Sequence, residues 1–481
     1  MEQIFNFLQY LVESSLLLIP YIIFGTYILL ATISAVTLIR YMRKNSYVDY
    51  NSLILAPLMP SISIIAPAYN EEHSIVENIR ALLSVYYNDY EVIIVNDGSR
   101  DGTLEKIIKA YDMEKENYAF EYQIPCERIK GVYKSRNRSL TKLTLIDKVN
   151  GGKADSLNAG INVSRSQLIV SIDADSILEP DALLKMVKPF IEEKDKRVIG
   201  TGGVVRIVNS CEIDGGVIKE IHLPKDMLAR IQVLEYTRAF LMTRMAWSRL
   251  DGLLLISGAL GMFDKEIVIK CGGYDIQTVG EDMELVVRMR RYMKENKRKY
   301  EVTYIPDPLC WTEVPTNYKI LSRQRNRWTR GTVETLFKHL KVFLNPNYGR
   351  FGILGYPYWF FVEWLGPIIE FCGITYFIIL AIMGKPNWPF FLLLLIFVYV
   401  LSVTMSIWSV LFEEMTYHKY EKKRDVLRLM GTAFLEPFVF HPFTVIWAIR
   451  ANIDYFLLGK KGWGKMERKG FYSSASSKDK N

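Results

Sequence analysis

The chain has 481 residues, enough for more than one domain, and half of them are hydrophobic while only 23% are charged. This balance excludes a disordered chain and differs from that of an ordinary soluble enzyme. A net charge of +8 is compatible with nucleic-acid binding, but the basic residues cluster at the ends of apolar runs, which favours a membrane protein and predicts no nucleic-acid partner. The five cysteines occur singly, which argues against a disulfide framework or a structural zinc site.

The first predicted element is a transmembrane helix within residues 1–45. The run Ser14–Ile39 contains no charged residue and exceeds the roughly 20 residues that cross a bilayer as a helix. A cleaved signal peptide would instead have a basic residue before a shorter apolar run. Arg40, Arg43 and Lys44 follow at once, so the positive-inside rule places the N-terminus outside and the following chain in the cytoplasm.

Residues 46–331 are predicted to form a cytoplasmic α/β domain with a mainly parallel sheet. Short runs rich in Ile and Val, such as 61–66, 91–95 and 167–172, alternate with polar helical stretches, which indicates βαβ units. Ligands bind at the carboxyl ends of the strands in such sheets, and polar residues follow each of these runs. An acid at one strand end can simply cap a helix, but acids at several strand ends favour a site for a nucleotide and a metal.

Aspartates follow two of these predicted strands. Asp97 comes after the second run, and Asp173-Ala174-Asp175 comes after the third. Because residues i and i+2 of a strand face the same way, the carboxylates of Asp173 and Asp175 can converge on one side. Two hard oxygen ligands suit Mg²⁺ or Mn²⁺, which would neutralise the charge of a diphosphate leaving group.

Three further motifs carry side chains suited to binding or catalysis. Gly151-Gly152-Lys153 offers a lysine that can pair with a diphosphate, although an ordinary helix start has the same pattern. Residues 280–284, Gly-Glu-Asp-Met-Glu, open a predicted helix; its dipole favours acids there in any case, and the sharper interpretation makes one of them a general base. Residues 324–328, Gln-Arg-Asn-Arg-Trp, offer arginines for phosphate and a tryptophan face for a sugar ring, or belong to a basic helix without chemistry.

An amphipathic interfacial helix is predicted over 332–350. Lysines there interleave with apolar residues at helical spacing, namely Val333, Leu336, Leu340 and Phe343. Such a stripe can lie in the membrane surface beside the α/β domain.

A transmembrane hairpin and a further membrane segment are predicted over 351–458. The hairpin consists of the apolar stretches 351–384 and 386–412, which a short turn joins. A single crossing by residues 429–449 would place the basic tail, 459–481, outside the cell, against the positive-inside rule. We therefore expect 429–449 to be re-entrant or interfacial and the tail to be cytoplasmic.

The motifs D-G-S, D-A-D, G-E-D and Q-R-N-R-W, in this order, resemble those of family 2 glycosyltransferases. The chain looks most like the processive membrane synthases of poly-N-acetylglucosamine, hyaluronan, chitin and cellulose. The resemblance covers residues 60–330 well and the membrane layout loosely. It implies a GT-A-type nucleotide-sugar-binding domain with transmembrane and interfacial helices, in an enzyme of the plasma membrane whose catalytic domain is cytoplasmic.

The resemblance also assigns donor-binding roles by position. Asp97 would contact the uridine of a UDP-sugar. Lys153 and Asp173 would lie near its diphosphate, and Asp175 would bind a divalent metal, Mg²⁺ or Mn²⁺.

The catalytic base and the acceptor side follow from the same resemblance. Asp282 would be the base, in the motif that these synthases usually write T-E-D. Gln324, Arg327 and Trp328 match the Q-x-x-R-W signature near the donor and the acceptor. Residues 257–259 stand where such enzymes place an acceptor-facing loop, but they lack the aromatic and cysteine residues of the cellulose-synthase version.

The predicted function is transfer, with inversion, of a hexose or N-acetylhexosamine from a UDP-sugar to a growing polysaccharide, in contact with membrane lipid. Single addition to a lipid-linked acceptor is the alternative: Q-R-N-R-W favours the polymer, whereas the small number of spanning helices favours it less. A passive transporter or channel would draw support from Glu363 and Glu370 inside an apolar stretch. The complete set of acids argues against a donor-binding protein without activity.

Overall fold

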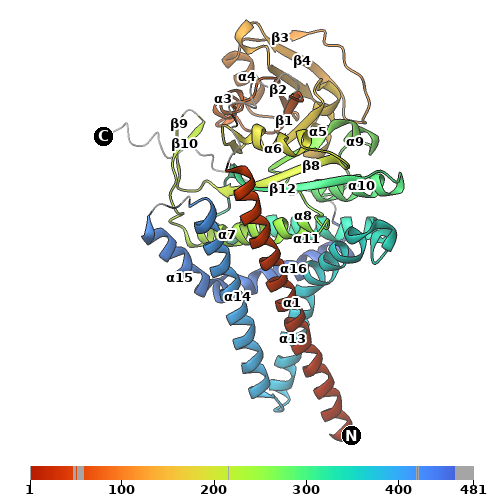
Figure 1. The fold of residues 1–481 in the computed structure, drawn as a ribbon, viewed down its shortest axis with the longest axis vertical. Coiled ribbons are helices and arrows are strands. Elements are labelled where there is room, and N and C mark those ends of the chain that lie inside the picture. The colour runs from red at the N-terminus through yellow and green to blue at the C-terminus, as the bar shows by residue number, and fades with distance from the viewer. Residues whose placement is uncertain are drawn as a thin grey trace.

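The computed structural model describes residues 2–46, 50, 59–214, 216–418, 420 and 422–460. Figure 1 shows an α/β domain at one end of the long axis and the tips of three long helices at the other. The basic tail predicted over 459–481 lies outside the described residues, except for its first two positions.

A ten-stranded sheet forms the centre of the α/β domain, in the order β3-β4-β5-β2-β1-β6-β11-β8-β12-β7. Its strands are β1 (Ile62–Ala68), β2 (Tyr90–Asn96), β3 (Met113–Glu116), β4 (Ile129–Ser135), β5 (Leu143–Lys148), β6 (Leu168–Ile172), β7 (Ile177–Leu178), β8 (Arg197–Ile207), β11 (Leu260–Asp264) and β12 (Tyr300–Thr312). The strands β5, β2, β1 and β6 run parallel, as do β8 and β12, whereas β11 and both edges pair antiparallel. The predicted α/β fold is confirmed, with a mixed sheet whose centre is parallel.

Helices cover this sheet and bury its parallel strands. The helices of the α/β domain are α3 (Ile75–Leu83), α4 (Thr103–Ala110), α5 (Lys153–Val163), α6 (Ala182–Ile191), α7 (Met227–Thr237), α8 (Met245–Arg249), α9 (Lys265–Lys270), α10 (Glu281–Glu295) and α11 (Tyr318–Lys338). Helix α5 packs on β1 and β2, and α6 packs on β8 and β12. Every residue of β6 is buried, as expected for a strand covered on both faces, and this explains its continuous apolar run. A two-stranded hairpin, β9 (Glu212–Asp214) and β10 (Val217–Glu220), stands apart from the main sheet.

Three segments within the described residues are long and apolar enough to cross a membrane: Val12–Asn45, Phe351–Ile382 and Trp388–Thr416. The first lies in α1 (Glu2–Asn45) and the third is α14 (Trp388–Thr416). The second passes through π-helical turns and the short α12 (Tyr356–Tyr358) before α13 (Leu365–Ile382). In Figure 1 the N-terminus and the α13–α14 turn lie at the same end of the molecule, far from the α/β domain. This agrees with a topology in which both lie on the same side of the membrane.

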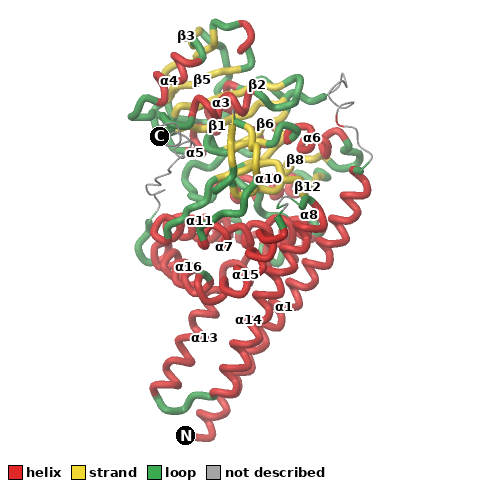
Figure 2. The backbone as a smooth tube through the Cα atoms, turned by 90° about the vertical axis from the view of Figure 1, so that its left-hand side faces the viewer, coloured by secondary structure: helices red, strands yellow, loops and turns green. Residues whose placement is uncertain are grey.

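The fourth apolar segment is broken into α15 (Lys423–Val439) and α16 (His441–Phe456), which meet at an angle of 48°. Pro442 stands in the first turn of α16, where a proline starts a helix but cannot continue one from the preceding turn. Both views show α15 and α16 beside the α/β domain, while the three long helices extend away from it (Figure 2). The bend is compatible with a re-entrant or interfacial segment and equally with a broken single span, so the predicted layout of this segment stays a prediction.

The helix predicted over 332–350 differs from the structure. Residue 332 falls inside α11, which ends at Lys338, and two short 3-10 turns follow it. Val333 and Leu336 are fully buried in a cluster with residues of the α/β domain such as Leu254, whereas Leu340 is 46% exposed. The buried half of the predicted stripe therefore packs on the protein itself and does not face lipid.

Polar contacts fasten the membrane helices to the α/β domain. Arg206 of β8 binds Glu413 of α14 at 2.5 Å, with both side chains almost fully buried. Tyr41 of α1 donates a hydrogen bond to Asp307 of β12. Because a buried charge without its partner is costly, these contacts hold α1 and α14 in one position against the sheet.

Candidate active site

A cavity of about 1010 Å³ begins at the carboxyl ends of the strands and continues between the membrane helices. Six of the eight predicted site residues line its upper part: Lys153, Asp173, Asp282, Gln324, Arg327 and Trp328. Asp97 and Asp175 are buried and do not line it. The structure thus brings most of the predicted site residues together in one cavity.

Lys153 occupies the middle of the acidic group. It is the first residue of α5, after Gly152, whose φ of 90° lies in the left-handed region that glycine favours. Its ammonium is 2.5 Å from Asp173 Oδ1 and 3.9 Å from Glu281 Oε1, and it donates to the carbonyl of Gly258 at 3.0 Å. Burial alone would lower the pKa of Lys153, but Asp173 and Glu281 outweigh it and raise the pKa above its ordinary value.

Asp97 holds the loop that leads into α5. Its carboxylate forms an ion pair with the fully buried Lys148 at 2.6 Å. It also accepts the backbone N–H groups of Gly151 at 2.9 Å and Gly152 at 2.8 Å. In this structure Asp97 therefore fixes the start of α5, and with it Lys153, from behind the cavity.

The geometry expected for Asp173 and Asp175 is wrong in one respect. Strand β6 ends at Ile172, and the backbone then turns, with the N–H of Ser176 donating to the carbonyl of Asp173 at 3.0 Å. The alternation of a strand consequently does not apply to these two residues. Asp173 lines the cavity, whereas Asp175 is only 5% exposed behind it.

The donor chemistry at this turn fits a hard divalent cation. Among the described residues no group of three or more His, Cys, Asp or Glu side chains could hold a metal. Mg²⁺, however, is commonly bound by one or two carboxylates together with waters and the phosphates of the substrate. Asp173, which lines the cavity, can supply one such carboxylate, whereas Asp175 follows two residues later and does not line the cavity.

The three acids at the start of α10 point in different directions. Asp282 Oδ2 accepts the N–H of Gly258 at 2.9 Å, and Glu281 also lines the cavity. Burial raises the pKa of Glu281 to about 7; Lys153 opposes the shift and Asp282 adds to it. The third acid, Glu284, is two residues after Asp282, about 200° around the helix, and does not line the cavity.

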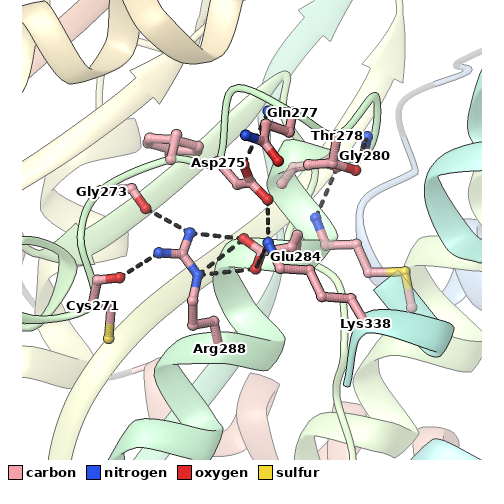
Figure 3. A network of polar contacts seen from close by, with 12 residues as sticks. Cys271, Gly273, Asp275, Gln277, Thr278, Gly280, Glu284, Arg288 and Lys338 are labelled. Atoms are coloured by element: carbon pink, nitrogen blue, oxygen red, sulfur yellow. Dashed lines mark hydrogen bonds and ion pairs between the residues drawn. The ribbon is translucent and has the colours of Figure 1, made fainter. Parts of the chain in front are cut away.

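Glu284 belongs to a separate ion-pair network, which Figure 3 shows. Arg288 donates to its carboxylate at 2.7 Å, and the ring of His339 lies 3.1 Å from it. Burial opposes ionisation, but hydrogen bonds from His339 and Arg288 outweigh it and lower the pKa of Glu284 to about 2. A carboxylate so firmly paired is a structural group.

Helix α11 supplies the wall opposite these acids. Gln324, Arg327 and Trp328 line the cavity, and Trp328 is 38% exposed. The guanidinium of Arg325 lies 4.4 Å from the centre of the Trp328 ring and is paired with Glu235 of α7 at 2.7 Å. A positive group over the ring fixes the orientation of Trp328.

One contributor, Glu235, was missed in the sequence, and another, Gly258, was expected to have a different partner. Glu235 lies on α7, outside every motif, and nothing in its local sequence marks it. The backbone of Gly258 joins Lys153 and Asp282, as its carbonyl accepts from one and its N–H donates to the other. Residues 257–259 are predicted to form a loop that faces the acceptor. In the structure Gly258 contacts Lys153 and Asp282 instead.

The part of the cavity between the membrane helices is lined mostly by apolar side chains, such as Leu16, Ile374 and Leu394, with two polar pairs among them. Glu370 of α13 lies 2.9 Å from the ring of His441 on α16. At the far end, Asn387 in the hairpin turn donates to Glu13 of α1 at 2.7 Å. The cavity thus reaches from the strand ends to the turn between α13 and α14.

A mixed α/β sheet with acids and a lysine at its strand ends, open toward membrane helices, defines a membrane glycosyltransferase of the GT-A fold. Residues 60–331, more than half of the chain, match the family described as glycosyltransferase-like family 2, and the chain belongs to this family. Residues 264–420 also match the chitin synthase family.

Relatives and a solved structure agree with this assignment. Poly-β-1,6-N-acetyl-D-glucosamine synthase of Staphylococcus epidermidis is 26% identical over 423 residues, which are 87% of each chain. The synthase of the same name from Staphylococcus aureus is 28% identical over 280 residues, 58% of this chain and 56% of the relative. Mannosyltransferase PcManGT from Pyrobaculum calidifontis, solved with GDP-Man and Mn²⁺, has the same fold, with a TM-score of 0.50 and 15% identity over 91% of this chain and 99% of that one. The predicted resemblance to polysaccharide synthases of family 2 is confirmed.

Proposed function

We propose that this protein transfers a hexose or N-acetylhexosamine from a UDP-sugar, with inversion, to a growing polysaccharide at the cytoplasmic face of the plasma membrane. The observation that carries this proposal is the continuous cavity, which joins the predicted donor and base residues to the space between the membrane helices. The relatives named as poly-β-1,6-N-acetyl-D-glucosamine synthases make UDP-N-acetylglucosamine the first donor to test.

The donor would bind between the strand ends and α11. Lys153 already lies among carboxylates, and a diphosphate entering the cavity would offer its ammonium a stronger anionic partner. Arg327 of α11, which lines the same cavity, would add a second positive charge. Asp97 would act on the donor by holding the loop before Lys153, and any contact with uridine would require that loop to rearrange.

Asp173 and Asp175 would hold a divalent cation, Mg²⁺ or Mn²⁺. Such a cation, when bound, neutralises charge on a departing diphosphate. The mannosyltransferase of related fold was solved with Mn²⁺, which supports testing that ion first.

Asp282 would take the proton of the acceptor hydroxyl while the hydroxyl oxygen attacks the anomeric carbon of the donor. The new glycosidic bond forms as the bond from that carbon to the diphosphate breaks, and attack from the opposite face inverts the centre. The contact with Gly258 fixes the direction of the Asp282 carboxylate. Glu281 is the second candidate, because its pKa near 7 suits proton transfer, but its 4% exposure and its nearby Lys153 partner favour Asp282.

A polysaccharide acceptor is favoured over a lipid-linked one by the relatives named as poly-β-1,6-N-acetyl-D-glucosamine synthases. Glu370 with His441, and Glu13 with Asn387, offer hydrogen-bonding groups along the membrane helices. A hydroxyl-rich chain can exchange hydrogen bonds with such groups, although apolar side chains make up most of this part of the lining. The same cavity would allow the product to move outward as it grows.

Incubation of membranes with a panel of nucleotide sugars and Mn²⁺ tests the proposal, with nucleotide release and product size as the readouts. We expect release of UDP together with a product of many sugar units. A product extended by one sugar would establish the lipid-linked alternative, and no release from any UDP-sugar would refute the proposed function. Membranes containing Asp282→Asn at the same protein level serve as the control.

A further inference from the structure

One face of α11 lines the cavity and, further along the helix, contacts the segment of the same chain that precedes α10. Gln324, Trp328 and Gly331 line the cavity, and Glu334 and Lys338 continue the same spacing of three and four residues beyond it. Residues at this spacing lie on the same side of a helix. The same rigid element therefore carries the predicted donor-binding side chains and the residues that contact residues 275–280.

The two backbones touch at Gly280 and Gly331. A Cβ atom added to Gly331 would lie 2.7 Å from Cα of Gly280 and 2.9 Å from its N. Ordinary contacts between carbon atoms lie at about 3.5–4.0 Å, so a side chain here would force the segments roughly 1 Å apart. Glycine within a helix costs about 1 kcal/mol relative to alanine, and at this position it permits the close approach.

Side chains of α11 hold the same segment in place. Glu334 accepts the hydroxyl of Thr278 at 2.7 Å and the N–H of Val279 at 2.9 Å. Lys338 donates to Asp275 (Figure 3). These contacts cover the residues immediately before the start of α10, where Asp282 stands.

The other side of the segment is fastened to α10 itself. Figure 3 shows Arg288 reaching back to the carbonyls of Cys271 and Gly273, the latter at 2.6 Å. The carboxylate of Glu284 lies between Arg288 and Lys338, at 2.7 Å and 3.2 Å. Residues 271–280 are thus clamped between α10 and α11, which removes their freedom to slide.

We infer that Gly331 and Glu334 are positioning residues, which set the place of Asp282 relative to Arg327 and Trp328. This inference rests on the proposed function, in which Asp282 deprotonates an acceptor beside a donor bound at α11. A displacement of about 1 Å between reacting groups can lower a rate by about 10²-fold without removing any group. Gly331 lines the cavity without a side chain and Glu334 does not line it, so both would act by placing the segment that precedes Asp282.

Four variants test the inference: Gly331→Ala, Glu334→Ala, Glu334→Gln and Gly431→Ala. The last is a matched control, since Gly431 is a helical glycine of α15 with no atom within 4 Å of an added Cβ. We expect Gly331→Ala and Glu334→Ala to lower kcat by roughly 10- to 100-fold while the Kd for UDP changes much less. Glu334→Gln should retain most activity, because its amide oxygen can still accept from Thr278 and Val279.

A purely structural role would lower the unfolding midpoint and leave the kcat of the folded fraction unchanged, which would overturn the inference. Equal kcat values for Glu334→Ala and Glu334→Gln would do the same. If Gly331→Ala does not fold, the pair of Glu334 variants decides. The absence of sugar transfer by the wild type, by contrast, would refute the proposed function itself.

Discussion

Replacement of Asp282 by asparagine tests the proposed base most directly. Both carboxylate oxygens accept backbone N–H groups, from Gly258 at 2.9 Å and Met283 at 2.8 Å. An amide has one acceptor oxygen, so Asp282→Asn leaves one N–H facing an amide N–H₂ group, at a cost of about 1–3 kcal/mol in stability. Removal of a general base lowers the rate by about 10²–10⁴-fold, which corresponds to about 3–5 kcal/mol in the barrier.

The two effects are separated by measuring them on the same preparation. Thermal unfolding reports the lost hydrogen bond, titration with UDP reports donor binding, and release of UDP with acceptor present reports turnover. We expect UDP affinity close to that of the wild type and turnover reduced by at least about 10²-fold. Glu281→Gln, which removes the neighbouring acid, is the comparison.

Turnover of Asp282→Asn near the wild-type rate would refute this reasoning. If Glu281→Gln then lost the activity, Glu281 would be the base. Glu284→Gln should affect turnover less than either, because Glu284 faces Arg288 and His339 on the other side of α10.

Three further predictions concern the metal, the topology and pH. Asp175→Asn, or chelation of the wild type, should abolish transfer, and full activity of either would remove the metal from the mechanism. Lys385→Cys should be labelled from outside by an impermeant thiol reagent in a cysteine-free background. Ser477→Cys, beyond the described residues, should be protected from the same reagent. Labelling of Ser477→Cys would show that α15–α16 crosses the membrane. The raised pKa of Glu281, about 7 against 4.5, means that the folded state binds this proton more tightly, so stability should fall as pH rises from about 4.5 to about 7. In Glu281→Gln, the unfolding midpoint should depend less on pH over that range. An unchanged pH dependence would contradict the raised pKa of Glu281.

Local sequence was sufficient for the elements whose formation depends on nearby residues. The predicted span at 14–39 falls within Val12–Asn45, and the predicted span at 386–412 nearly coincides with α14. Both were predictable because the ability to cross a membrane depends on the apolar length of a single segment. The β-like runs likewise became β1, β2 and β6, whose burial on both faces requires continuous apolar residues.

Side-chain direction was harder to predict. Asp173 and Asp175 lie in a turn because β6 pairs with its neighbours only as far as Ile172, and pairing depends on distant strands. Residues expected to start a helix at 332 instead belong to α11, which begins at Tyr318, and their apolar stripe packs on the α/β domain. A hydrophobic pattern predicts that a face is covered and does not say whether lipid or protein covers it.

The sequence by itself determined the family, the α/β fold, the apolar segments long enough to cross a membrane and most of the residues that line the cavity. Only the tertiary structure decided which acids share the cavity, because the rotation of α10 turns Asp282 inward and Glu284 toward His339. It alone also brought Gly280 against Gly331. Motifs record the kind of side chain at each position, whereas catalysis depends on distances between atoms far apart in the chain, and the packing of helices on the sheet sets those distances.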